Sequence, residues 1–187
     1  MSQRPEQALR VPPSNSPGMG APRQQLSPLF GLPRPVVRRV GLVVGVVLVA
    51  DQVTKALAPQ LASPGAPGWL QPVHNPDVLM SVYSGTPALL VVLGLAALIG
   101  FSVHLLRLVR GGILPGWAAG LLAGGAASNL ADRLVQGAVR DWLATPWVVA
   151  NLADLAVAAG AVCYLAAGAR WALAVWAEAS TKTPAAG

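Results

Sequence analysis

Charged side chains are scarce in this sequence. Of 187 residues, 11% are charged and 54% are hydrophobic, whereas about a quarter of the residues of a typical soluble domain are charged. The hydrophobic residues also occur in runs that are longer than the core of a small soluble protein requires. Runs of that length are typical of membrane spans. The shortage of charge therefore excludes an ordinary soluble domain and predicts a small polytopic membrane protein.

Cysteine and histidine are almost absent. The single cysteine, Cys163, cannot form a disulfide within the chain. The two histidines, His74 and His104, fall at opposite ends of the expected helices, and no His-Glu-x-x-His or cysteine cluster occurs. Zinc sites need three or four such ligands close together. We therefore expect neither a metal nor another cofactor.

A basic face of the kind that binds nucleic acid is also missing. The net charge is +6, but the Lys and Arg residues flank the hydrophobic runs and are not interleaved with aromatic residues on one surface. We expect membrane lipids as partners and no nucleic acid.

Four hydrophobic segments predict an all-α membrane protein with four transmembrane helices, over residues 36–57, 88–106, 113–131 and 148–169. The third segment repeats small residues at intervals of about four, at Gly116, Gly120 and Gly124. This spacing is typical of a helix face that packs closely against another helix.

The remaining segments set the expected domain limits. Residues 1–35 are rich in Pro, Gln, Ser and Arg and predict a disordered cytoplasmic tail. Residues 36–176 form the expected four-span domain, and residues 177–187 a short C-terminal tail. Between the first two spans, residues 58–87 are rich in Pro and Gly. Strands over 69–75 and 78–83 would make this loop a small extracytoplasmic subdomain with some β structure.

The distribution of Lys and Arg predicts the orientation. These residues are frequent in the N-terminal tail, in the 107–110 turn and near the C-terminus, and the 58–87 loop has none. Cytoplasmic loops carry the excess of positive residues, so both termini are expected in the cytoplasm. The 58–87 loop and the 132–147 loop are expected outside. Arg133 and Arg140 in the second of these loops are exceptions to the rule, but each lies next to an aspartate.

The aspartates gather on one side of this topology. All five fall at the outer ends of spans or in the outer loops: Asp51, Asp77, Asp132, Asp141 and Asp154. A carboxylate near hydrocarbon costs a few kcal/mol, and acidic residues that served only solubility would not segregate in this way. The pattern predicts a functional site at the outer membrane–water boundary.

Paired carboxylates are the chemistry that such a site offers. Two neighbouring carboxyl groups share one proton, so that one acts as a base toward water and the other as an acid. We expect Asp141 and Asp154 to form this pair, with the adjacent Arg140 lowering the pKa of Asp141 and biasing it toward the role of base. Asp132 is expected to cap or pair locally. A proton-coupled transporter and an inactive membrane scaffold are the alternatives, although no aspartate lies in the cytoplasmic half to complete a path across the membrane.

Five short motifs, in this order, resemble those of the lipoprotein signal peptidases (signal peptidase II), which are four-span bacterial aspartic peptidases. They are Asp-Gln-Val-Thr-Lys at 51–55, Asn75 before a turn, Gly-Gly-Ala at 124–126 with Asn-Leu-Ala-Asp-Arg at 129–133, Asp141, and Asn-Leu-Ala-Asp at 151–154. The resemblance covers about residues 36–170.

The resemblance implies a function and a set of site residues. It implies catalysis by Asp141 and Asp154 at the outer face of the bacterial cytoplasmic membrane. The implied substrate is a prolipoprotein with a diacylglyceryl-modified cysteine, cleaved just before that cysteine. The residues implied to support the site or hold the substrate are Asp51, Lys55, Asn75, Asn129, Arg133 and Asn151.

This chain departs from the usual family pattern at five positions: Asp77, Met80, Ser128, Arg140 and Ala150. The family usually has Gly at the first and third of these positions, an aromatic residue at the second and fifth, and Val at the fourth. The departures predict altered walls of the substrate site, as in a paralogue with different substrates or slower turnover.

Overall fold

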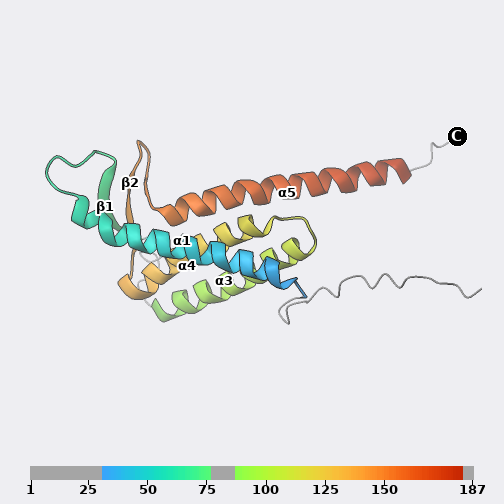
Figure 1. The fold of residues 1–187 in the computed structure, drawn as a ribbon, viewed down its shortest axis with the longest axis horizontal. Helices are drawn as coiled ribbons and strands as arrows, with labels where there is room; N and C mark the ends of the chain where they lie inside the picture. Colours follow the sequence, from blue (N-terminus) through green and yellow to red (C-terminus); the bar gives the residue numbers. More distant parts are fainter. Residues whose placement is uncertain (1–30, 77–86, 183–187) are drawn as a thin grey trace, which may run out of the picture.

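The structure is a computed structural model that describes residues 31–76 and 87–182 (Figure 1). Its elements, in chain order, are α1 (Arg34–Leu61), β1 (Leu70–Asn75), α3 (Pro87–Arg110), α4 (Gly116–Gln136), β2 (Val139–Ala144), β3 (Val149–Ala150) and α5 (Leu152–Lys182). The expected positions Asp77 and Met80, and the expected strand over 78–83, lie outside the described residues.

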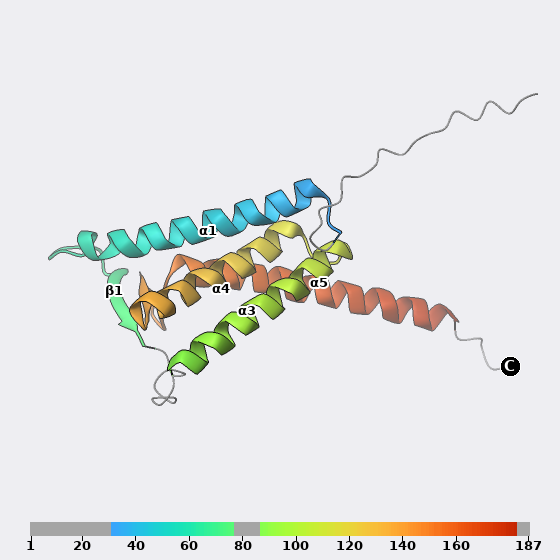
Figure 2. The same cartoon turned by 90° about the horizontal axis from the view of Figure 1, so that it is seen from below.

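Helix α4 lies at the centre of the bundle and packs against α1, α3 and α5 (Figures 1 and 2). Its small residues make these contacts possible. A Cβ atom on Gly120 would lie 2.7 Å from Val43 Cβ on α1, and one on Gly125 would lie 2.5 Å from the carbonyl oxygen of Ala153 on α5. The close packing predicted from the glycine spacing is therefore confirmed.

Three helical segments in the described part of the chain are long and apolar enough to cross a membrane: Arg34–Leu61, Val92–Arg110 and Leu152–Thr181. The expected fourth span, α4, is not among them. Its sequence is rich in Gly and Ala and includes Asn129, Asp132 and Arg133, which lowers its hydropathy. Because neighbouring helices cover α4, its side chains meet protein on several sides and need not be as apolar as those facing lipid.

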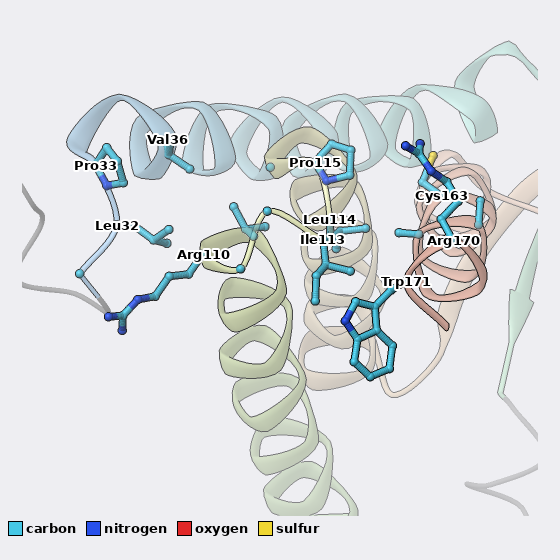
Figure 3. A pocket seen from close by; sticks show the side chains of 17 residues that line it. Leu32, Pro33, Val36, Arg110, Ile113, Leu114, Pro115, Cys163, Arg170 and Trp171 are labelled. Carbon is cyan, nitrogen blue, oxygen red and sulfur yellow. The ribbon is translucent and has the colours of Figure 1, made fainter. Parts of the chain in front are cut away.

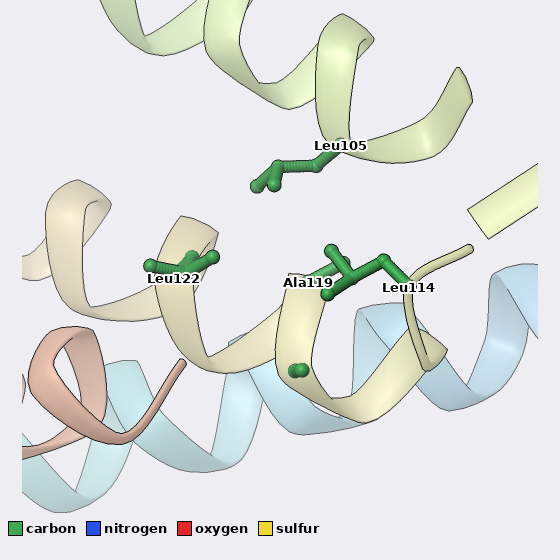
Figure 4. Close-up of a cluster of buried hydrophobic side chains, with 5 residues drawn as sticks. Leu105, Leu114, Ala119 and Leu122 are labelled. Atoms are coloured by element: carbon green, nitrogen blue, oxygen red, sulfur yellow. The ribbon is translucent and has the colours of Figure 1, made fainter. Parts of the chain in front are cut away.

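A small hydrophobic core joins α3 to α4 near the turn between them. It consists of Leu105, Leu114, Ala118, Ala119 and Leu122, all buried (Figure 4). Many other large apolar side chains on the helices are exposed, as Leu42 and Val46 are on α1 with 66% and 58% exposure. Outward apolar side chains are what a bilayer requires.

The three strands form an antiparallel sheet in the order β1-β2-β3 at one end of the bundle (Figure 2). The strand predicted over 69–75 is confirmed as β1. Its described partner is β2, from the segment before α5, so the sheet joins two loops and is not confined to the first loop. The register pairs Val73 with Asp141 and Asn75 with Val139. This pairing brings Asn75 close to Asp141.

Helix α5 differs from the expected fourth span at both ends. Residues Val149 and Ala150 pair with β2, so the helix starts at Leu152 and not at residue 148. It continues to Lys182, beyond both 169 and the expected domain limit of 176. A helix of this length measures about 46 Å at 1.5 Å per residue, and its last turns extend past the ends of the other helices (Figures 1 and 2).

Candidate functional site

The site lies at the end of the bundle that carries the sheet, which we call the carboxylate end. Asp51 and Lys55 are one turn apart on α1 and both are buried. Lys55 Nζ lies 2.6 Å from Asp51 Oδ2 and 3.0 Å from Asp132 Oδ2, and it donates to Asn129 Oδ1 at 2.9 Å. A buried ammonium is tolerated only when it is partnered in this way. Lys55 therefore joins α1 to α4.

Asp51 extends the same network to α5. Its Oδ2 accepts a hydrogen bond from Ser128 Oγ at 2.7 Å, and its Oδ1 accepts one from the backbone N–H of Ala153 at 2.9 Å. Asp51 thus fixes the three helices relative to one another. Ser128, which stands where the family usually has Gly, supplies a hydrogen bond that Gly could not supply.

Asp132 is occupied by structural partners. Its Oδ1 accepts from Gln52 Nε2 at 3.0 Å and from Arg140 Nη2 at 2.6 Å, and its Oδ2 accepts from the backbone N–H of Arg140 at 3.0 Å. With Lys55 also in contact, both oxygens have charged or amide partners. The expected structural role of Asp132 agrees with these contacts, but the pairing is not local, because the partners come from α1 and β2.

Arg140 does not act on Asp141 as the sequence suggested. Its guanidinium bonds Asp132 and also donates to Gln52 Oε1 at 2.6 Å. Successive residues of a strand point to opposite faces, so the side chains of Arg140 and Asp141 diverge. The expectation that Arg140 lowers the pKa of Asp141 is wrong: burial raises the pKa of that carboxyl above its usual value.

The start of α5 positions Asp154. The side-chain oxygen of Asn151 accepts from the backbone N–H of Asp154 at 2.9 Å, and Asp154 Oδ2 accepts from the backbone N–H of Asn151 at 3.1 Å. This reciprocal pair is a capping box. A carboxylate in the first turn is also stabilised by the helix dipole. The local sequence thus fixes Asp154 at the helix terminus.

Asp141 is held from two elements. Asn151 Nδ2 donates to its Oδ1 at 2.6 Å, and Asn75 Nδ2 on β1 donates to its Oδ2 at 3.1 Å. Burial is the main cause that raises the pKa of Asp141, and repulsion from Asp154 adds to it. The two amide hydrogen bonds oppose this rise. The net effect is a pKa for Asp141 that is raised above its usual value.

Asn129 connects the two carboxyl groups to the buried cluster. Its Nδ2 donates to Asp154 Oδ1 at 2.8 Å. Its Oδ1 accepts from Asn151 Nδ2 at 3.2 Å as well as from Lys55. Asp141 and Asp154 are therefore bridged by Asn151, and Asn129 bonds both Asn151 and Asp154.

The structure brings seven of the eight residues expected from the sequence into this one network: Asp51, Lys55, Asn75, Asn129, Asp141, Asn151 and Asp154. For the eighth, Arg133, the contact described is between its carbonyl oxygen and Gly137 N, which closes α4. Gln52 and Ser128 belong to the network but were not expected as site residues. Gln52 could have been expected from the sequence, because it lies inside the 51–55 motif.

Fold and site together define the class: a multi-pass helical membrane protein with a buried carboxylate–amide network at one end of its bundle. The sequence profile of the family described as signal peptidase (SPase) II matches residues 43–170. The chain belongs to the signal peptidase II family and is a peptidase by class.

Individual proteins agree with this assignment. A lipoprotein signal peptidase of Rhodococcus jostii is 37% identical over 150 residues, which cover 70% of this chain and 74% of the relative. One from Pelotomaculum thermopropionicum is 34% identical over 128 residues, or 64% and 84% of the two chains. A solved bacterial membrane enzyme at 1.9 Å resolution shares the fold with a TM-score of 0.56 and 21% identity, covering 70% of this chain and 92% of its own.

Proposed function

We propose that this chain is an aspartic endopeptidase that removes signal peptides from diacylglyceryl-modified prolipoproteins by cleaving before the lipidated cysteine. The observation that carries the proposal is the pair of carboxyl groups on Asp141 and Asp154, both bonded to Asn151 at the carboxylate end. The name of the matched relatives, lipoprotein signal peptidase, supports the substrate class.

The environments of the two carboxyl groups suggest their starting roles. Asp154 lies in the first turn of α5 and accepts from Asn129 and Asn151, so it is assigned as the base. Asp141 is buried with a raised pKa, so it is assigned as the proton donor. The proton belongs to the pair, and the assignment describes the resting state.

The reaction then proceeds in two steps. Asp154 takes a proton from water while the water oxygen bonds to the scissile carbonyl carbon, and Asp141 protonates the carbonyl oxygen. In the second step Asp154 delivers its proton to the leaving nitrogen as the C–N bond breaks, and a hydroxyl of the intermediate returns a proton to Asp141. Both groups end as they began. Such acid–base catalysis contributes roughly 10²–10⁴-fold per group.

The other site residues are proposed to act indirectly or toward the substrate. Asp51, Lys55, Asn129 and Asn151 would hold the helices and the pair in place, because their bonds link α1, α4 and α5. Asn75 would hold Asp141 through its hydrogen bond, and Arg133 is assigned to the substrate side of the site. Ser128 and Arg140, although unusual for the family, both bond internally.

For the membrane placement we propose four spans, with both termini in the cytoplasm and the carboxylate end at the outer face of the cytoplasmic membrane. The close contacts of α4 with three other helices support its counting as the fourth span. Reporter fusions at Gly65 and Gly112 should report opposite sides of the membrane. The same side for both would refute this placement.

The decisive experiment uses purified protein and a diacylglyceryl-modified lipobox peptide. Wild type should cleave before the modified cysteine, and Asp154→Asn should not. A peptide of the same sequence without the lipid is the control for substrate class, and it should be cleaved far more slowly. A well-folded wild type that cleaves neither peptide would instead support the inactive paralogue.

A further inference from the structure

A large cavity lies at the end of the bundle opposite the carboxylate end, which we call the arginine end. Its volume is about 1190 Å³, and it is an open cavity bordered by the start of α1, the α3–α4 turn and the middle of α5 (Figure 3). Leu32, Val36, Ile113, Leu114 and Ala167 form apolar walls. None of the residues proposed for catalysis lines it.

The charge around this cavity has one sign. Arg110 at the end of α3 and Arg170 on α5 line it, and no Asp or Glu is among the lining residues. Among the described residues, neither arginine forms an ion pair or a side-chain hydrogen bond. Figure 3 shows the two side chains on either side of the α3–α4 turn. Two arginines without carboxylate partners attract an anion.

The first turn of α4 adds to this preference. Gly116 lines the cavity, and the preceding Pro115 provides no side-chain cap. Backbone N–H groups at a helix start carry partial positive charge. The helix start is a minor contribution beside the arginines, but it has the same sign.

The apolar walls of the cavity favour a lipid over a free anion as its ligand. A small soluble anion would not need apolar walls or a cavity of this volume. Trp171, 56% exposed, also lines the cavity, and tryptophan is favoured at the headgroup level of membranes. Basic pockets between membrane helices on the cytoplasmic side are known to bind anionic headgroups.

We propose that this cavity binds an anionic phospholipid of the leaflet opposite the carboxylate end. Its headgroup lies at the rim of the cavity that Arg110 and Arg170 line, and its upper acyl chains lie on the apolar walls. The proposal rests on the membrane placement proposed above and not on the peptidase activity.

The sole cysteine of the chain provides a direct test, because Cys163 lines the cavity. The full chain is placed in nanodiscs of phosphatidylcholine, with or without phosphatidylglycerol, and the rate of Cys163 alkylation by N-ethylmaleimide is measured. Phosphatidylglycerol should slow the reaction about tenfold if it is present at ten times its Kd, since the empty fraction then falls to about a tenth.

Variants of the arginines test whether these side chains cause the protection of Cys163. The double variant Arg110→Gln/Arg170→Gln should lose the protection, while Arg107→Gln, a cation on the same helix that does not line the cavity, should keep it. Equal rates in both lipid mixtures, or protection that persists in the double variant, would overturn the proposal. Protection by inorganic phosphate alone in phosphatidylcholine would also overturn it in favour of a soluble anion.

A second measurement covers the case in which the double variant folds poorly. Native mass spectrometry of wild type should retain phosphatidylglycerol in preference to phosphatidylcholine, and the single variant Arg170→Gln should weaken that preference. No preference in wild type contradicts the proposal. A protein that shows the lipid effect but never cleaves a lipobox peptide would refute the proposed peptidase function and leave the lipid site standing.

Discussion

The two ends of the helix bundle differ in whether their charged side chains have partners within the protein. At the carboxylate end, every side-chain oxygen of Asp51, Asp132, Asp141 and Asp154 accepts at least one hydrogen bond or ion pair within the protein. At the arginine end, Arg110 and Arg170 line an open cavity and have no such partners among the described residues. Within the described part of the chain, the carboxylate oxygens at one end are all partnered, although Arg140 Nε and Trp142 Nε1 there are buried without a partner, whereas the two arginines at the other end have none.

The difference indicates what each end is suited for. Groups that must hold a fixed geometry are best placed by partners already present before the ligand arrives, as Asn129 and Asn151 place the carboxyl pair. Groups that bind a mobile ligand keep their donors available. If this comparison is right, changes at the carboxylate end should disturb a geometry that is fixed before substrate binds.

The largest effect is expected when the pair itself is changed. Asp141→Asn and Asp154→Asn should each reduce kcat for lipobox peptide cleavage by roughly 10²-fold or more, and the double variant should be little worse, because groups that act as a unit are not additive. Both variants should insert normally, since Asn is close in size to Asp and costs less to bury than a charge. A well-folded single variant that loses less than about tenfold in kcat would exclude that residue from catalysis.

Asp132→Asn is the matched control for that experiment. Asp132 has Lys55 and Arg140 as structural partners, so its loss should lower the melting temperature more than it lowers the rate in the folded fraction. Full activity in Asp141→Asn with loss in Asp132→Asn would mean that Asp132 is the true partner of Asp154.

The next effect concerns the close contact between Gly125 on α4 and Ala153 on α5, which lies next to Asp154. In Gly125→Ala, the new Cβ would lie 2.5 Å from the carbonyl oxygen of Ala153 and 2.7 Å from Val157 Cγ2, so α5 must shift beside Asp154. Overpacking of this kind costs about 1–3 kcal/mol, and kcat should fall with stability. Gly45→Ala, where the new Cβ meets nothing within 4 Å, is the control. Equal melting temperatures for the two variants would contradict this packing.

Much of this end of the molecule could be predicted from sequence because the signals are local. Asp51 and Lys55 are one helical turn apart, and Asn151 and Asp154 have the spacing of a capping box. Both pairs are in contact. The glycine repeat predicted close packing of α4 without any knowledge of its neighbours.

The remainder depends on non-local pairing. Asn75 and Asp141 are 66 residues apart, and no local rule predicts that β1 pairs with β2. Once β2 is known, alternation of side chains along the strand would have placed Arg140 on the face opposite Asp141. The fourth span was expected to end near residue 169 because Arg170, Trp171 and Trp176 suit a membrane interface. Such residues do not end a helix, and α5 continues to Lys182.

A smaller effect should show whether Arg140 acts on Asp141 and Asp154 or only on the stability of the fold. Arg140→Val introduces the residue usual for the family and leaves buried Asp132 with fewer donors, at a cost of about 1–3 kcal/mol. The melting temperature should fall. The pH dependence of kcat/KM should stay unchanged, because the guanidinium bonds Asp132 and Gln52. A shifted pH profile would show that Arg140 acts on Asp141 after all. Arg107→Gln, at the other end, should change neither quantity.

The smallest effect is a shift of the pH profile in Asn75→Ala. Burial raises the pKa of Asp141, and the hydrogen bond from Asn75 opposes that rise by favouring the charged form. Without this bond the pKa of Asp141 should rise further.

The sign of the effect on catalysis follows from the assigned roles. The proposed mechanism needs a proton on Asp141, so activity on the high-pH side falls as that proton is lost. In Asn75→Ala the high-pH limb of kcat/KM, which reports groups of the free enzyme, should therefore move to higher pH. Gln71→Ala on the same strand, whose side chain bonds only the carbonyl oxygen of Gly68 among the described residues, should leave the limb in place. If instead the low-pH limb moves to higher pH in Asn75→Ala and the high-pH limb stays in place, Asp141 is the ionised member of the pair and Asp154 carries the proton.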